Sequence, residues 1–230
     1  MNRRLGNGLL TSLKLVRYVV LAAVGSTLGA AIIPVTNPSF ETLPGSPILH
    51  GCGGTCAFTI ASENAIPGWN ASLPGNEGQF NPGLPGTTTY YNSVPDGSWI
   101  AYANVGNLTQ VVSPVTANTL YTLTVALGLR KDFPVLGTAE LFINGAAYTA
   151  TGVAPTSGNW STFTATYNSG LHPADVGLPI TIELISNGVQ AGFDNVALNA
   201  VSTAIPEPGT LMLIGVALML FGLAGRLRWS

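Results

Sequence analysis

The clearest chemical signal in this chain is a pair of cysteines that stand close together. Cys52 and Cys56 lie in the stretch HGCGGTCAF, and two of the three residues between them are glycines. In an exported chain such a pair predicts a small disulfide loop. A zinc site would need more ligands than these two thiols and His50, and a thioredoxin-like redox motif has two intervening residues instead of three. We therefore predict a disulfide between Cys52 and Cys56.

Residues for catalysis are harder to find. The sequence contains neither G-x-S-x-G nor H-E-x-x-H, and its only histidines are His50 and His172. His172 precedes Pro173 and has no obvious nucleophile beside it. A glycosidase would need two carboxylates at a set separation, which sequence alone does not place. We assign no catalytic residue and expect that the chain is not an enzyme, with a glycan-active enzyme as the remote alternative.

Aromatic residues offer a different chemistry, because a sugar site needs an aromatic platform with a few fixed polar groups. In the stretch SWIAYAN, strand alternation would place Trp99 and Tyr102 on opposite faces, so one of the two is expected in the core. The alternative for every candidate is simple packing. The predicted ligand-binding residues are Trp69, Tyr90, Tyr91, Trp99 and Tyr102, with Asn70, Asn92 and Asn104 as hydrogen-bonding neighbours.

Charge narrows the choice of partner. Between Ile32 and Ile205 the chain has two basic and nine acidic residues. Such a segment lacks the basic surface that nucleic acids require, and it would not be attracted to anionic lipid. It suits neutral sugars, or cations held by carboxylates.

The two ends of the chain indicate where it works. Residues 1–31 combine four basic residues with a short apolar run and small residues at the end. This pattern is typical of a secretory signal peptide, with an uncut membrane anchor as the alternative. At the other end, Pro206, Glu207 and Pro208 precede the sixteen uncharged residues 209–224, and Arg226 and Arg228 follow after Gly225. As a helix those sixteen residues span about 24 Å, so a transmembrane helix over 209–225 is short but feasible.

This closing segment, IPEPGTLMLIGVALMLFGLAGRLRW, resembles the PEP-CTERM sorting signal of exopolysaccharide-producing Gram-negative bacteria. The matching residues are Pro206, Glu207, Pro208, Arg226 and Arg228. The resemblance implies recognition by an exosortase, a membrane-embedded cysteine enzyme that cleaves near the motif. It also implies export across the inner membrane, anchoring through the C-terminal helix, and final placement at the cell surface or in the extracellular matrix. A plain single-pass anchor is the alternative.

Between the two ends, short β-like runs alternate with turn residues. Asn144-Gly145 between two apolar runs is a strong hairpin signal. Alternating apolar residues predict one core face in the strand at 120–129 and one in the strand at 179–186. No stretch shows apolar residues at a convincing helical spacing. We predict an all-β, two-sheet antiparallel sandwich flanked by the signal helix and the transmembrane helix. The expected core residues are Tyr121, Leu123, Val125, Leu127, Leu129, Ile180, Ile182 and Leu184.

The order of landmarks also resembles a family. VTNPSFE, IPGWN, DGSWIAYAN and a closing GFDNVAL follow one another as in galactose-binding-like jelly rolls, which occur in carbohydrate-binding modules and PEP-CTERM ectodomains. The cysteine loop is a departure from that pattern. The resemblance implies a structural Ca²⁺ held by Glu41 and Asp194 with the help of backbone carbonyls. Alternatively, Asp194 caps a turn and Glu41 is solvated.

Together these features predict three parts: a signal peptide (1–31), an exported β-sandwich (32–202) and a sorting signal (203–230). We expect an exosortase-processed protein of the cell surface or the exopolysaccharide matrix, whose sandwich binds extracellular polysaccharide and no nucleic acid. The alternative is a structural matrix or adhesion protein without a discrete ligand site.

Overall fold

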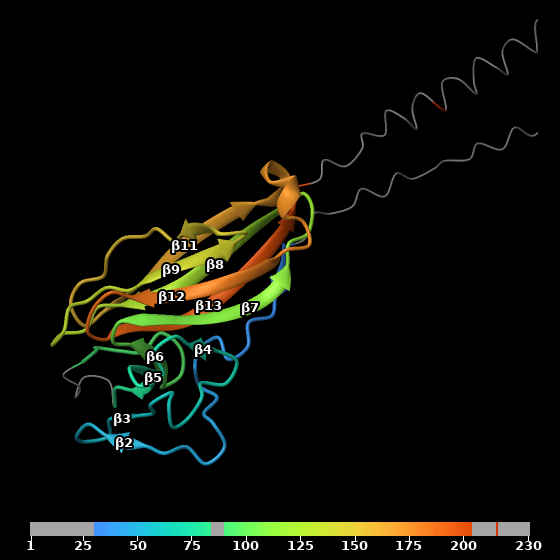
Figure 1. The fold of residues 1–230 in the computed structure, drawn as a ribbon. Helices are drawn as coiled ribbons and strands as arrows, with labels where there is room; N and C mark the ends of the chain where they lie inside the picture. Colours follow the sequence, from blue (N-terminus) through green and yellow to red (C-terminus); the bar gives the residue numbers. More distant parts are fainter. Residues whose placement is uncertain (1–29, 84–89, 204–214, 216–230) are drawn as a thin grey trace, which may run out of the picture. The chain divides into compact units, whose positions relative to one another are not determined.

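Alternating apolar residues build two antiparallel sheets that face each other across one core (Figure 1). The computed structural model describes residues 30–83, 90–203 and Gly215. The predicted signal helix, apart from Ala30 and Ala31, and the predicted transmembrane helix, apart from Gly215, lie outside the described residues. No helix within the described part is long and apolar enough to cross a membrane. The predicted two-sheet antiparallel sandwich is confirmed.

The larger sheet has eight strands. β1 (Ala30–Ile33) pairs with β13 (Ala191–Ser202) beside the main path. The main path runs in the order β11 (Trp160–Asn168), β8 (Thr119–Gly128), β13 (Ala191–Ser202), β6 (Ile100–Ala103), β5 (Glu77–Asn81), β3 (Ala57–Phe58) and β2 (His50–Gly51).

The smaller sheet has five strands, and a short helical segment follows β11 at one end of the sandwich. That segment comprises the 3-10 helices η1 (Ser169–Leu171) and η2 (Pro173–Asp175). The five strands run in the order β10 (Ala146–Thr149), β9 (Thr138–Ile143), β12 (Pro179–Ser186), β7 (Gly106–Pro114) and β4 (Asn70–Ala71).

The predicted core faces of β8 and β12 are confirmed with one exception. The four alternate residues of β8 from Tyr121 to Leu127 are at most 1% exposed, and Ile180, Ile182 and Leu184 of β12 are fully buried. Leu129 is only half-buried, because β8 ends at Gly128. The predicted Asn144-Gly145 hairpin is also present and joins β9 to β10. Both turn residues have positive φ (50° and 78°), as a two-residue type I′ turn requires.

β6 is the strand that connects the core to the site. Ala101 and Ala103 point into the core between the sheets, whereas Ile100 and Tyr102 point to the outer face of the larger sheet. There they join a second apolar cluster, which we call the outer cluster. Its buried members are Cys56, Phe80, Tyr91, Ile100 and Tyr102.

Candidate ligand pocket

A row of residues crosses the larger sheet beneath the outer cluster. Strand register places Gly78, Tyr102, Gly192, Gly128 and Trp160 side by side on β5, β6, β13, β8 and β11. Because three of the five are glycines, this strip of the outer face carries few side chains of its own. Aromatic side chains from elsewhere can therefore lie directly on the backbone of the sheet.

Tyr91 occupies this strip. A Cβ atom at Gly192 would lie 2.3 Å from the Tyr91 hydroxyl, and one at Gly128 would lie 2.8 Å from the rings of both Tyr91 and Trp160. Those two rings pack with their centroids 4.6 Å apart, and Tyr91 is 1% exposed. Tyr91 is thus buried between the sheet and Trp160.

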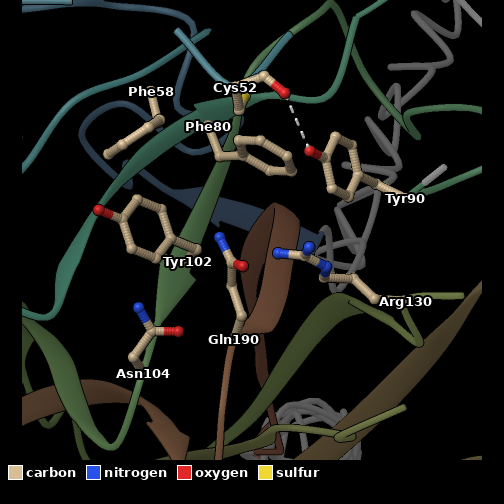
Figure 2. A pocket seen from close by; sticks show the side chains of 8 residues that line it. All are labelled: Cys52, Phe58, Phe80, Tyr90, Tyr102, Asn104, Arg130 and Gln190. Carbon is tan, nitrogen blue, oxygen red and sulfur yellow. Dashed lines mark hydrogen bonds between the residues drawn. The ribbon is translucent and has the colours of Figure 1, made fainter. Parts of the chain in front are cut away.

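Tyr102 from the same row lines a pocket of about 230 Å³ (Figure 2). The wall combines four aromatic rings, two carboxamides, one guanidinium group and one half of a disulfide. The lining residues are Cys52, Phe58, Phe80, Tyr90, Tyr102, Asn104, Arg130 and Gln190.

The Tyr102 ring is held in place by its hydroxyl, which donates a hydrogen bond of 2.9 Å to the backbone carbonyl of Thr59. Phe58 and Phe80 meet it edge to face, with ring centroids 6.4 and 6.5 Å away. Burial, together with the charges of Glu63 and Glu77, raises the pKa of Tyr102 to about 12. The hydroxyl is therefore neutral at physiological pH and keeps its proton for the bond to Thr59.

Arg130 forms the opposite wall and is only 3% exposed. Its guanidinium carbon lies 4.6 Å from the ring centroid of Tyr90 and 5.5 Å from that of Phe80. Asp132 accepts two hydrogen bonds from the same guanidinium group. Although burial acts in the other direction, these bonds and the positive charge hold the pKa of Asp132 below its usual value. Arg130 is thus a fixed, charge-compensated wall group.

The β2–β3 hairpin closes the pocket on a third side. Cys52 and Cys56 form a disulfide within this hairpin. The Tyr90 hydroxyl donates a hydrogen bond of 3.3 Å to the carbonyl oxygen of Cys52, as the dashed line in Figure 2 marks. The hairpin is further fixed by His50, whose ring stacks on Phe58 with centroids 5.2 Å apart. The cysteine loop is therefore part of the pocket wall.

The five aromatic residues predicted to bind ligand do not form one site. Tyr90 and Tyr102 line the pocket, whereas Tyr91 is buried beside it. Trp69 lies in the main core at 5% exposure, and its ring N–H donates to the Asn37 carbonyl. Trp99 is half-buried and is not among the residues that line the pocket.

Half of the pocket wall carries no signal that the sequence pattern revealed. Arg130 was the residue with a usable signal, because it is one of only two basic residues between Ile32 and Ile205. The others sit in ordinary strand or turn patterns. The lining residues that no sequence pattern pointed to are Phe58, Phe80, Arg130 and Gln190, whereas Asn104 was expected as a hydrogen-bonding neighbour.

The predicted calcium ligands lie at one loop. Glu41 accepts backbone hydrogen bonds from Ser98 and Trp99 (2.7 and 2.6 Å), and Asp194 accepts one of 3.0 Å from Asp96. Burial, assisted by the charges of Asp96 and Glu41, raises the pKa of Asp194 to about 7. In the part of the chain that the structure describes, no three His, Cys, Asp or Glu side chains come close enough to hold a metal ion together. A calcium ion here would need several backbone carbonyl ligands.

Residues 31–199 match the family model described as HpiC1 cyclase. This chain belongs to the HpiC1-like family. The expectation that the chain is not an enzyme was wrong, because the model of this family is described as that of a cyclase. The motif search failed because it tests for nucleophiles and metal ligands, whereas the pocket of this family member is built from aromatic rings and amides.

Solved structures agree on the fold. A cyclase from Fischerella sp. TAU is 23% identical with a TM-score of 0.60, covering 77% of this chain and all of the cyclase. A complex of a Fischerella sp. TAU cyclase with 4-(1H-indol-3-yl)butan-2-one gives 23% identity and a TM-score of 0.59, covering 76% of this chain and all of the other. The xylan-binding CBM22-1 domain of Paenibacillus barcinonensis Xyn10C is 12% identical with a TM-score of 0.41, covering 78% and 100%. A TM-score of 0.41 is too low to support any conclusion about this chain. No curated protein matches the sequence.

Residues 204–228 match the PEP-CTERM protein-sorting motif, as predicted. The motif implies export and an anchored precursor that an exosortase processes. The residues assigned to it lie outside the described part of the structure: Pro206, Glu207, Pro208, Arg226 and Arg228.

Proposed function

We propose that this HpiC1-like protein is exported and binds one compact, ring-containing organic molecule as the substrate of a cyclisation. The observation that carries the proposal is the pocket of about 230 Å³ walled by four aromatic rings. Pockets for drug-sized ligands typically measure about 300–1,000 Å³, so this one suits a single or fused ring system. A polysaccharide chain would extend well beyond it.

The wall chemistry fits ring closure within one molecule. Such a reaction needs its substrate folded so that the joining atoms meet, and apolar ring faces hold that compact shape. Aromatic faces also stabilise developing positive charge. Among the described residues, those that line the pocket include no carboxylate and no histidine. The pocket would therefore hold its substrate through shape, contacts with ring faces and hydrogen bonds. Any strong acid that the reaction needs would come from a group outside this wall.

Carbohydrate is the second candidate ligand. The observation in its favour is that the carboxamides of Asn104 and Gln190 stand beside the Tyr102 ring, a combination that recognises sugar hydroxyls on an apolar sugar face. The size of the pocket limits such a ligand to about one sugar unit. Placement at the cell surface or in an exopolysaccharide matrix of a Gram-negative bacterium would bring such glycans into reach.

A structural Ca²⁺ at Glu41 and Asp194 is also part of the proposal. Supporting it is the full burial of Asp194, which has no basic side chain paired with it among the described residues. A cation would compensate that buried charge. The ion would stabilise the loop at Asp96 and supply no step of the chemistry.

Calorimetry on the full chain in detergent tests the ligand class. The probes are 4-(1H-indol-3-yl)butan-2-one and an oligosaccharide of the producing cell's own exopolysaccharide. We expect saturable binding of the indole ketone, weakened at least tenfold by Phe58→Ala and unchanged by Phe142→Ala, an exposed phenylalanine on the other sheet. Binding of the oligosaccharide alone would select the second candidate. Binding of neither would refute both.

A further inference from the structure

One wall atom of the pocket lacks the partner that its burial demands. The side-chain oxygen Oδ1 of Asn104 is buried and has no hydrogen-bond partner in the structure. Buried polar atoms are nearly always hydrogen-bonded, because an unpaired acceptor loses its interaction with water without replacement. An unpaired acceptor in a pocket wall therefore points to a group that the ligand supplies.

The backbone around Asn104 is firmly positioned. Ala103 pairs with Ala191 at the end of β6, so Asn104 and Gln190 are the next residues on two adjoining strands. The Asn104 N–H donates 2.9 Å to the carbonyl of Asn76, and the Val105 N–H donates 2.9 Å to that of Gly188. Figure 2 shows the two carboxamides of Asn104 and Gln190 on the same side of the pocket, next to Tyr102.

Gln190 of this carboxamide pair and Val105, which follows Asn104, adopt left-handed backbone conformations. Val105 has φ of 67° and Gln190 has φ of 59°. A β-branched residue rarely adopts such a φ, and residues in strained conformations cluster at ligand sites, where the surrounding structure maintains them. The strained turn at Val105 directly follows Asn104. It thus fixes the point at which the chain leaves the pocket wall.

We propose that Asn104 determines the specificity of this pocket: its Oδ1 accepts a hydrogen bond from an N–H or O–H group on the ring ligand. This inference rests on the proposed function and narrows its substrate class to ring molecules that carry a donor at their edge. A ring N–H points outward in the plane of the ring. A flat heteroaromatic molecule can therefore lie against the aromatic walls while its N–H reaches Asn104.

A matched pair of ligands tests the inference on the full chain in detergent. Calorimetry compares 4-(1H-indol-3-yl)butan-2-one with its N1-methyl derivative, which has the same ring but no donor. We expect the methyl derivative to bind the wild-type chain at least about tenfold more weakly, because a buried acceptor is left unpaired. In Asn104→Leu the preference should disappear, and the acceptor-retaining Asn104→Asp should keep it.

The control variant is Asn70→Leu, which removes an exposed carboxamide on β4 outside the pocket. It should retain the full preference for the N–H compound. Equal affinity of the wild-type chain for both compounds would overturn the role of Asn104 and leave the proposed function standing. A preference that survives in Asn104→Leu would assign the contact to another group. Binding of neither compound would overturn the proposed function and this inference together.

Discussion

The hydroxyl of Tyr91 occupies the place where a side chain at residue 192 would begin: a Cβ atom on Gly192 would lie 2.3 Å from it. Trp160 stands 3.1 Å from the same point. The glycine is therefore required for the outer cluster to reach the sheet. Because the outer cluster shares Phe80 and Tyr102 with the pocket, the same glycine supports the site.

Gly192→Ala should destabilise the fold by about 1–3 kcal/mol, because the added methyl group overpacks a filled site. Thermal unfolding of the full chain measures the effect. Gly75→Ala is the matched control, since nothing lies within 4 Å of the added atom there. Adding Tyr91→Phe, which removes the nearest atom, should recover part of the loss. Equal melting temperatures for the two glycine variants would contradict this account.

Asp132→Asn should weaken ligand binding several-fold and destabilise the fold by about 1 kcal/mol, because it breaks the paired hydrogen bonds that fix Arg130. The contrasting variant is Glu63→Gln, which changes the solvent-accessible side-chain contact of 2.6 Å with His50. Exposed pairs contribute about 0–1 kcal/mol, so that change should be small. Calorimetry and thermal melting on both variants check the prediction. An equal loss of binding in the two would show that Arg130 needs no anchor.

The carboxyl of Asp194 predicts a pH dependence. Its pKa of about 7 lies above the unfolded value near 3.8, so the folded state holds the extra proton between these values. In chelator, stability should be highest below about pH 4 and should fall as the pH rises toward 7, by on the order of 3 kcal/mol. Ca²⁺ should reverse this loss at pH 7.5, because it favours the ionised carboxylate.

Melting curves at pH 5 and pH 7.5, with chelator or with Ca²⁺, measure this dependence. Asp194→Asn should abolish the Ca²⁺ effect and remove the part of the pH effect that this carboxyl contributes. A wild-type chain whose melting at pH 7.5 is unchanged by Ca²⁺ would remove the metal from the proposal. The pH effect in chelator would still hold.

Replacing both cysteines of the hairpin, Cys52→Ser with Cys56→Ser, should lower stability by about 2 kcal/mol, as expected for a loop this short. Ligand binding should weaken as well, because the carbonyl of Cys52 holds the Tyr90 hydroxyl at the pocket wall. We expect at least a fivefold loss of affinity by calorimetry on folded protein. Unchanged affinity would mean that the hairpin closes the pocket without its disulfide.

Local patterns in the sequence determined much of this protein. The alternation from Tyr121 to Leu127 predicted a core face that is at most 1% exposed, and Asn144-Gly145 predicted the β9–β10 turn. The closing Pro206-Glu207-Pro208 segment identified the sorting motif. Each of these signals lies within about a dozen residues, where the pleat of a strand or the φ of a turn residue acts directly on its neighbours.

Only the tertiary structure decided the site. Gly78, Tyr102 and Gly192 meet in one row because β5 and β6 pair with each other and with the distant β13 in a particular register. The pocket likewise gathers residues that lie between Cys52 and Gln190 in the chain. No local sequence pattern shows that these residues come together. Alternation shows which face of a strand a residue occupies. Which residues then face one another depends on strand register, and that is fixed by packing across the whole sandwich.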